Sequence, residues 1–360
     1  MSVVFFHQNE VADRPGGVER YLSTLIDQAG DGGLLITEAC PNGDSAQRNS
    51  RVGVAMPLSG SMPKWLSYVI GVMMGAGEIR RAINRLGPCT LEFSRPEYAL
   101  FSWMFKGAKV FTLHGTGPAR SEGSKYWIHY ISCLMLPLAA DIVQIIGRDR
   151  RGLPQWTYAR MATRLRYIDA WYDDVFRVAP MKDVDGPLRV FFAGRLARMK
   201  NPELLFKIIE AASCSPDGGF EFRYFGADGD KIPEGPMRQK FHSAGLLNAQ
   251  QLATAIADCH VGILCSSYGE GSPFIIVEAL ACGRGFVLPP LPGLIDAYRN
   301  YRGTMFAPDY TVDAFIKTLS EMRSAITNGL TPEAIANDVS GRNKTVMVQQ
   351  ILQRLEADHD

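Results

Sequence analysis

Residues 261–283 read VGILCSSYGEGSPFIIVEALACG, and this stretch decides the fold. Its first five residues form a short apolar run, which indicates a buried strand. Pro273 to Cys282 reads as a helix, with Ser272 as the N-cap and Pro273 at the first helical position. A buried strand that leads through a short loop into a helix is the repeating unit of a parallel α/β sheet.

The loop in this stretch predicts an anion site. Glu270, Gly271 and Ser272 lie where the strand hands over to the helix N-terminus, where backbone N–H groups and the positive end of the helix dipole converge. Gly271 allows a ligand to approach the backbone closely. Glu278 follows one to two turns into the helix, so the two carboxylates can reach different parts of one ligand. Either glutamate alone is more often a capping or solvated residue, and only the ordered set is specific.

A second loop carries two cations that suit a diphosphate. Arg195 and Lys200 follow an apolar strand at 188–193, and Asn201 reads as the N-cap of the next helix. Arginine can bind phosphate oxygens bidentately and lysine acts as a point charge. Each cation alone is more often a solvated loop residue.

Short apolar strands alternate with helical patterns along the whole chain, which predicts parallel sheets with crossover helices. A stretch near residues 177–187 has the composition of a linker. Five strands are expected before it, at 3–6, 34–37, 90–93, 109–113 and 142–146. Four are expected after it, at 188–193, 220–225, 261–265 and 285–288.

These motifs together resemble the retaining family 4 glycosyltransferases, which have the GT-B fold. The spacing of Glu270 and Glu278 is similar to that family's Glu-x7-Glu signature, and the loop with Arg195 and Lys200 resembles its Gly-Arg-Leu…Lys-Gly motif, with Asn201 in place of the last Gly. The resemblance implies that Arg195 and Lys200 bind the donor diphosphate. It also implies that Glu278 holds the ribose hydroxyls and Glu270 the donor sugar.

Other positions enter through the same resemblance. The Gly-Gly loop before residue 18 matches a family loop that reaches the donor. The loop after residue 225 matches a family loop that borders the nucleotide base. The His in Thr-Leu-His-Gly resembles the family's acceptor-side His. The implied catalytic residues are Arg195, Lys200, Glu270 and His114. The implied donor-binding residues are Gly16, Gly17, Gly226, Gly271, Ser272, Pro273, Phe274 and Glu278.

The resemblance implies an α/β fold of the GT-B type, with two Rossmann-like domains facing across a cleft. Residues 1–180 would form the acceptor domain and residues 181–340 the nucleotide-sugar donor domain. Residues 341–360 would form a C-terminal helix able to pack back on the first domain.

The expected activity is retaining transfer of a sugar from a nucleotide-diphosphate sugar to a hydroxyl acceptor, either a saccharide or a lipid-linked saccharide in surface polysaccharide synthesis. Because two cations can neutralise the diphosphate, no metal and no cofactor are expected, the nucleotide sugar being a substrate. Two alternatives stay open: a donor-binding, non-catalytic partner subunit and a sugar-nucleotide epimerase. The partner interpretation draws on two departures from the family in the first half. Gly147-Arg148 stands in place of a usual Ser, and the run Ile168 to Asp173 keeps only the Asp of the family's Asn-Gly-Val-Asp sequence.

Net charge and cysteine content indicate which kinds of partner and which cellular compartment to expect. A formal net charge of +1 gives no reason to expect nucleic acid, and seven scattered cysteines favour a reducing, cytoplasmic setting. The start of the chain reads as a first strand rather than a signal peptide. Residues 65–77 are apolar and flanked by Lys64, Arg80, Arg81 and Arg85, so the segment 64–85 is either a core helix or a contact with the inner face of a membrane. A second apolar segment, Tyr126 to Ala140, reads as a core helix.

Overall fold

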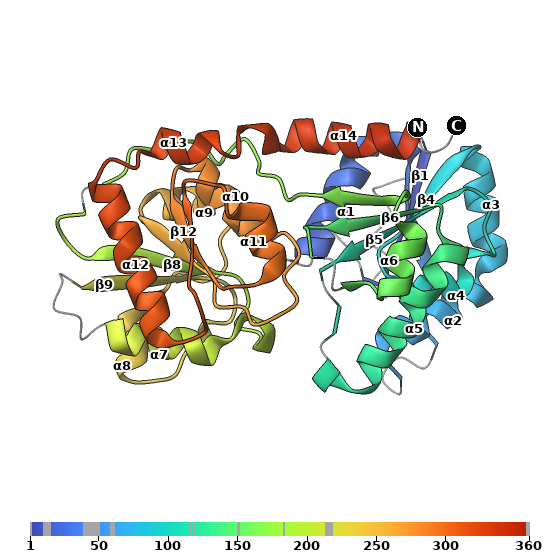
Figure 1. Ribbon diagram of the computed structural model, residues 1–360. Helices are drawn as coiled ribbons and strands as arrows, with labels where there is room; N and C mark the ends of the chain where they lie inside the picture. Colours follow the sequence, from blue (N-terminus) through green and yellow to red (C-terminus); the bar gives the residue numbers. More distant parts are fainter. Residues whose placement is uncertain are drawn as a thin grey trace. The chain divides into compact units, whose positions relative to one another are not determined.

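The computed structural model describes residues 2–9, 16–38, 51–57, 62–115, 117–118, 120–149, 152–182, 184–212 and 219–357. The chain divides into two compact units (Figure 1). The first unit comprises residues 1–146, 150–168 and 348–360, and the second comprises residues 147–149 and 169–347. The segment between residues 169 and 187 contains no helix or extended strand among its described residues.

The first unit is built on a parallel sheet of seven strands in the order β3-β2-β1-β4-β5-β6-β7. The strands are β1 (Ser2–Phe6), β2 (Gly33–Glu38), β3 (Arg51–Val54), β4 (Cys89–Phe93), β5 (Ala108–His114), β6 (Ile142–Ile146) and β7 (Leu165–Ile168). The α-helices are α1 (Gly17–Ala29), α2 (Lys64–Met74), α3 (Ala76–Leu86), α4 (Ala99–Ser102), α5 (Ser124–Ala139) and α6 (Gln155–Met161).

The two faces of this first sheet differ in chemistry. One face stacks aromatic rings, with Phe6 to Phe93 and Phe93 to Phe111 both at 4.7 Å between ring centroids. These rings share a hydrophobic core with side chains of α2 to α6. The opposite face, which Tyr21 of α1 touches through a hydrogen bond to Gln144, buries Glu92 and Gln144 beside apolar side chains such as Phe5 and Val110. The alternation of side chains along parallel strands therefore places an aromatic layer on one side of the sheet and a mixed layer on the other.

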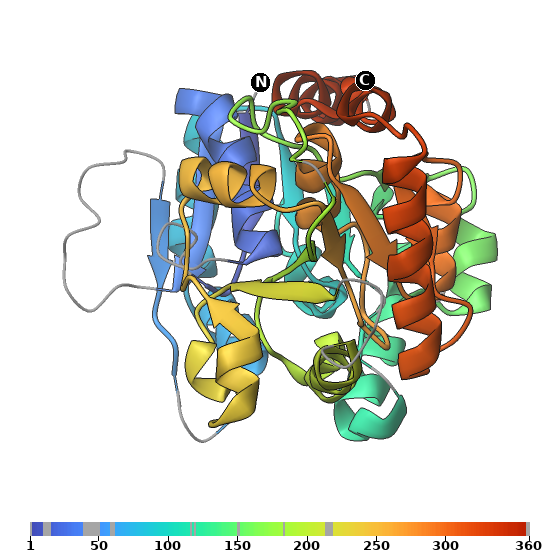
Figure 2. The same ribbon diagram turned by 90° about the vertical axis from the view of Figure 1, so that its left-hand side faces the viewer.

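The second unit holds a parallel sheet of six strands in the order β10-β9-β8-β11-β12-β13, seen from its own side in Figure 2. The strands are β8 (Leu188–Ala193), β9 (Phe220–Phe225), β10 (Phe241–Ser243), β11 (Val261–Ile263), β12 (Gly285–Leu288) and β13 (Thr304–Phe306). The α-helices are α7 (Pro202–Ala212), α8 (Pro236–Lys240), α9 (Ala249–Ala257), α10 (Phe274–Ala281), α11 (Pro292–Tyr298), α12 (Val312–Thr327) and α13 (Pro332–Asn337).

Helices cover this second sheet, and its strands are buried accordingly. Helix α12 contacts α7 as well as β12 and β13, while α10 contacts β11 and α9 (Figures 1 and 2). At the centre of the sheet Gly262 leaves room for two rings, because a Cβ there would lie within 3 Å of both Phe191 and Phe286. One continuous apolar core results. The last helix, α14 (Lys344–Ala357), begins among residues grouped with the second unit and ends among residues grouped with the first.

The predicted α/β architecture of two Rossmann-like units is confirmed. All nine predicted strands are present, and β11 ends two residues earlier than expected. Four strands escaped the sequence analysis, namely β3, β7, β10 and β13. These four are the two edge strands of each sheet.

Candidate active site

The strand order of the second sheet predicts where a ligand binds. From β8 the chain first moves outward to β9 and β10, and it then returns to the other side of β8 for β11, β12 and β13. The order therefore reverses between β8 and β11, and ligands in such sheets bind beyond the carboxyl ends of the strands at that reversal. The loops that follow these two strands carry Arg195 and Lys200 in one case and Glu270 to Phe274 in the other.

The structure brings Lys200 and Glu270 into direct contact. Lys200 Nζ donates a hydrogen bond to Glu270 Oε1 at 2.5 Å, and the hydroxyl of Ser266 donates to the same oxygen at 2.5 Å. The Glu270 side chain is only 7% exposed and that of Lys200 17%, so the ion pair is largely shielded from water. An ammonium group has three donors, so Lys200 can hold Glu270 and still donate to a ligand. Sequence reasoning missed Ser266, although its place in the loop after β11 could have suggested it.

The loop after β8 is shaped by an unusual backbone conformation at Asn201. This residue has φ 51° and ψ 59°, and among the described residues it alone combines a positive φ with a side chain. Asparagine tolerates the left-handed region better than most residues, which explains why it can replace the usual Gly of the motif. Its Oδ1 accepts from Leu204 N at 3.4 Å, a long bond that agrees with the predicted N-cap role for α7.

Arg195 lies on the same loop and is exposed. The backbone beside it is fixed, because Leu196 N donates to Asp228 Oδ2 at 2.7 Å. The structure thus places Arg195 on the same short loop as Lys200, with its side chain open to solvent.

A tyrosine joins the loops after β8 and β9. The Tyr224 hydroxyl donates to Gly194 O at 3.0 Å and accepts from Asp228 N at 3.1 Å. Gly226 passes so close to this hydroxyl that a Cβ would lie 2.4 Å from it and 2.4 Å from Gly194 O. Gly226 is therefore required by the packing of the two loops, whatever ligand it borders.

The expectation that Ser272 caps helix α10 is wrong. The helix begins at Phe274, Pro273 takes the N-cap position, and no side chain caps it. The Ser272 hydroxyl instead accepts from Ala170 N at 2.9 Å and lies 3.1 Å from the Tyr298 hydroxyl. The tertiary contacts of the hydroxyl have replaced the local cap, and Ser272 ties the loop to the segment that enters the second unit.

A close contact beside this loop explains why glycine stands at position 147, where the family that the sequence resembles usually has Ser. Gly147 has φ +91°, and a Cβ there would lie 2.2 Å from Gly271 O. A serine could not occupy this position without moving the Gly271 loop. Phe274 packs edge-on against Trp171, with 5.2 Å between ring centroids.

Glu278 lies on α10 and is 2% exposed. The helix is apolar around it, and Gly283 with φ +75° follows its end. Glu278 is the fifth of the eight residues of α10, and a buried carboxylate is a suitable acceptor for ligand hydroxyl groups.

The remaining predicted residues belong to the first unit. His114 ends β5, and burial lowers its pKa to about 3, so the ring is neutral at physiological pH. Its ring meets Tyr21 edge-on at 5.1 Å between centroids. Gly16 is the N-cap of α1 and Gly17 its first residue, and a Cβ on Gly16 would lie 2.1 Å from Glu19 Oε2.

The first sheet also reverses its strand order, between β1 and β4, and the residues there were not predicted. His7 follows β1 and its Nδ1 lies 2.7 Å from the hydroxyl of Ser94, which follows β4. Its Nε2 lies 3.7 Å from Glu19 Oε1, and the facing imidazole is the main cause that lowers the pKa of Glu19 to about 2. Strand order, which the sequence did not reveal, was the signal needed to find this cluster.

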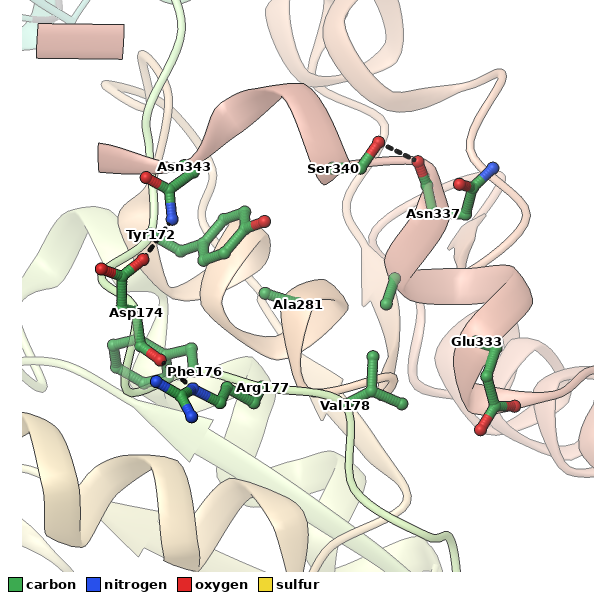
Figure 3. Close-up of a pocket in the computed structure, with 11 residues that line it drawn as sticks. Tyr172, Asp174, Phe176, Arg177, Val178, Ala281, Glu333, Asn337, Ser340 and Asn343 are labelled. Atoms are coloured by element: carbon green, nitrogen blue, oxygen red, sulfur yellow. Dashed lines mark hydrogen bonds between the residues drawn. The ribbon is translucent and has the colours of Figure 1, made fainter. Parts of the chain in front are cut away.

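A separate open hollow of about 460 Å³ lies at the other end of α10 (Figure 3). Ala281, near the C-terminus of that helix, lines it together with residues of the 172–178 segment and of α13. Polar side chains on its wall have partners within the unit, since the Asn343 amide donates to the Asp174 carboxylate and the Ser340 hydroxyl donates to the backbone carbonyl of Asn337. None of the predicted site residues lines this hollow, so it is distinct from the candidate active site.

No three His, Cys, Asp or Glu side chains form a group that could hold a metal ion within the described ranges. The polar groups of the candidate site are instead a lysine, a glutamate and hydroxyls. Such a set suits a phosphate and sugar hydroxyls.

One part of the chain is similar to a known protein family. Residues 187–324 match the family model described as glycosyl transferases group 1. This range contains Arg195, Lys200, Glu270 and Glu278. A search of curated proteins found no match.

Several solved structures share the fold of the whole chain. The HepE protein of Anabaena, solved in complex with UDP and glucose, is 16% identical with a TM-score of 0.74, and the match covers 99% of this chain and 100% of that one. The sucrose-phosphate synthase of Thermosynechococcus elongatus is 14% identical with a TM-score of 0.74, over 99% of this chain and 98% of that one. The lipopolysaccharide outer core galactosyltransferase WaaB is 13% identical with a TM-score of 0.69, over 99% of each chain. The chain therefore has the GT-B fold, and within it residues 187–324 are similar to the glycosyl transferases group 1 family.

Proposed function

We propose that the protein transfers a sugar from a nucleotide-diphosphate sugar to a hydroxyl acceptor with retention of anomeric configuration. The single observation that carries this proposal is the Lys200–Glu270 pair, which stands where the strand order of the second sheet reverses. It lies within the range that matches the group 1 family model. Solved complexes of HepE with UDP and with UDP-glucose support UDP-sugars as the first donors to examine.

The chemistry follows from where charge develops. The bond between the anomeric carbon and the β-phosphate oxygen breaks, its electron pair stays on the phosphate, and the sugar becomes oxocarbenium-like. The acceptor oxygen then bonds to the anomeric carbon on the same face, and its proton passes to the departing phosphate. Lys200 and Arg195 stabilise the phosphate charge, together with the backbone N–H groups at the start of α10.

The other site residues bind and orient. In this proposal Glu270 accepts hydrogen bonds from sugar hydroxyls, and Lys200 and Ser266 hold it in place for that role. Glu278 accepts from the ribose, and Gly226 borders the base. Gly271, Ser272, Pro273 and Phe274 form the donor loop, the Gly16-Gly17 turn reaches the donor, and the neutral His114 serves the acceptor. Because lysine and arginine supply the positive charge, we propose that transfer needs neither a metal nor a cofactor.

We further propose that the acceptor is a saccharide or a lipid-linked saccharide of a surface polysaccharide, used in the cytoplasm at the inner face of a membrane. None of the described helices is long and apolar enough to span a bilayer. Within segment 64–85, Tyr68, Val69 and Val72 are buried in the core of the first unit, whereas Met73 and Met74 are exposed. The three arginines of α3 are also exposed, so the outer part of this segment keeps the character needed for contact with lipid.

A direct experiment separates the proposed transferase from its alternatives. The protein is incubated with UDP-, GDP-, dTDP- and ADP-sugars, and the products are followed by proton NMR. Slow release of a sugar with the donor's anomeric configuration supports retaining transfer, and it should persist in EDTA. Binding without turnover indicates a partner subunit, and an isomerised sugar nucleotide indicates an epimerase.

A further inference from the structure

An apolar stripe runs along the outside of helix α5 in the first unit. Trp127, Ile131 and Leu138 are 60%, 57% and 92% exposed, which is extreme for side chains of this size. At 100° per residue these three positions fall within a sector of about 40°, and they span about 16 Å of helix. We call these three residues the α5 stripe.

The opposite side of the same helix is also apolar, but it is buried. Ser132, Cys133 and Leu136 face the interior of the unit. A surface helix of a soluble domain normally turns a polar face to water. Helix α5 is thus apolar on both sides, and packing within the unit accounts for only one of them.

Exposed apolar side chains also gather on the neighbouring elements. Of twelve large exposed apolar residues in the described chain, eight lie between residues 73 and 156 of the first unit. Helices α4 and α6 both contact α5, and they bring exposed Trp103, which follows α4, and Trp156 on α6. Tryptophan beside tyrosine is typical of a membrane interface, and Trp127 contacts Tyr126 and Tyr130 at 5.4 and 5.9 Å between ring centroids.

Arginines stand beside these apolar groups. Arg120 lies over the ring of Tyr126 at 5.8 Å and Arg160 over the ring of Trp156 at 5.4 Å. Arg164 donates to Pro137 O at 3.3 Å, next to Leu138 in the chain. Helices α2, α3, α5 and α6 carry six basic side chains and one acidic one, Glu78.

We propose that the α5 stripe and its flanking arginines dock the protein on an anionic lipid surface. Apolar side chains enter the headgroup boundary while arginines meet lipid phosphates. A second copy of the chain is a poorer occupant, because a twofold contact would bring the same arginines of both copies together. This surface differs from segment 64–85, most of whose apolar side chains are buried in the core. It does not depend on the donor site.

The test is co-sedimentation with vesicles of phosphatidylcholine alone or with 30% phosphatidylglycerol. We expect wild type to pellet with the anionic vesicles at low salt and to be released as salt screens the charges. A Trp127→Ser/Ile131→Ser/Leu138→Ser variant should bind at least about tenfold more weakly, because each apolar side chain loses its transfer to lipid. The matched control Val178→Ser/Leu246→Ser/Val346→Ser removes exposed apolar side chains of the second unit and should bind like wild type.

Vesicle binding and the oligomeric state can each overturn the proposal. Equal vesicle binding by the stripe variant and wild type, or no binding by either, overturns the proposal. A concentration-dependent dimer of wild type in sedimentation velocity that the stripe variant abolishes also overturns it, in favour of a second copy. Donor turnover with a soluble nucleotide sugar should be the same in both triple variants, which separates this proposal from the proposed function.

Discussion

The two sheets reverse their strand order at one place each, and the residues gathered there differ in kind. In the second unit an ion pair, Lys200 with Glu270, occupies the reversal and is held by a hydroxyl. In the first unit the reversal holds an imidazole, a hydroxyl and a carboxylate, His7, Ser94 and Glu19. A lysine ammonium group suits a charged diphosphate, whereas an imidazole and a hydroxyl beside a carboxylate suit an uncharged hydroxyl.

The two units also differ in the side chains that their sheets bury. The second sheet is apolar throughout its interior and locks its loops by close backbone packing, as at Gly226. The first sheet buries Glu92 and Gln144 on the face that α1 covers. The part that matches the family model is thus the unit with the apolar sheet. The departures at Gly147-Arg148 and in residues 168–173 lie outside the matched range, whereas Asn201 lies within it.

The largest effect is expected when a positive charge is removed at the strand-order reversal of the second sheet. Lys200→Ala should lower donor turnover by about 10²–10³-fold, because a preorganised contact to the leaving phosphate is lost. Arg195→Ala should give a loss of the same order. Lys207→Ala, an exposed lysine on the adjacent helix α7, is the matched control and should keep wild-type turnover. Equal rates in Lys200→Ala and the control would show that the Lys200–Glu270 ion pair takes no part in donor turnover.

The next effect concerns stability at the buried carboxyl of the first sheet. Burial raises the pKa of Glu92 to about 8. Between about pH 4.5 and 8 the unfolded chain has released this proton while the folded chain keeps it, so stability falls as pH rises across that window, by up to about 1.4 kcal/mol per pH unit.

Glu92→Gln removes this proton exchange with little change of shape. The variant should lose less stability than wild type between pH 5 and 8, measured by urea unfolding at each pH. Glu78→Gln, at an exposed position of α3, should follow wild type. Parallel pH curves for Glu92→Gln and wild type would show that Glu92 is ionised in the folded protein.

A third effect probes the close packing of the second unit. Gly226→Ala should destabilise the protein by about 1–3 kcal/mol, because its Cβ would overlap the Tyr224 hydroxyl and Gly194 O. Gly186→Ala is the control, since a Cβ there meets nothing within 4 Å. Urea unfolding measures both, and a neutral Gly226→Ala would mean that the two loops are not packed together.

The smallest effect is expected at Asn201, which has a left-handed backbone conformation in the loop after β8. Asn201→Ala should cost about 1 kcal/mol, because alanine pays the steric penalty of φ 51° and loses the cap. Asn201→Gly should cost only a few tenths, since glycine adopts this conformation freely. Thermal unfolding of the two variants gives the order, and a reversed order would contradict the conformation.

The sequence predicted the interior of both sheets and failed at their edges. Interior strands such as β1 and β8 are almost wholly buried, so they appear as continuous apolar runs. The edge strands β3 and β10 have one buried residue each, and their sequences, RVGV and FHS, carry no such run. Periodicity reports burial, and a strand buried on few sides gives little signal.

The candidate site was predictable to the extent that it is local. The loop containing Glu270 and the helix start after it follow from residue types along the chain. Ser272 was misassigned because its partners, Ala170 and Tyr298, are 102 and 26 residues away. The His7 cluster was missed for the same reason, since His7 meets Ser94 only through the pairing of β1 with β4.

The central claim is that the two loops at the second reversal form the nucleotide-binding site. Hydrogen exchange with and without saturating UDP, or whichever of UDP, GDP, dTDP and ADP binds most tightly, tests it most directly. We predict slower amide exchange in residues 194–201 and 266–278, and loss of that protection in Lys200→Ala. Unchanged exchange in both segments at saturation, with protection elsewhere, would contradict the account.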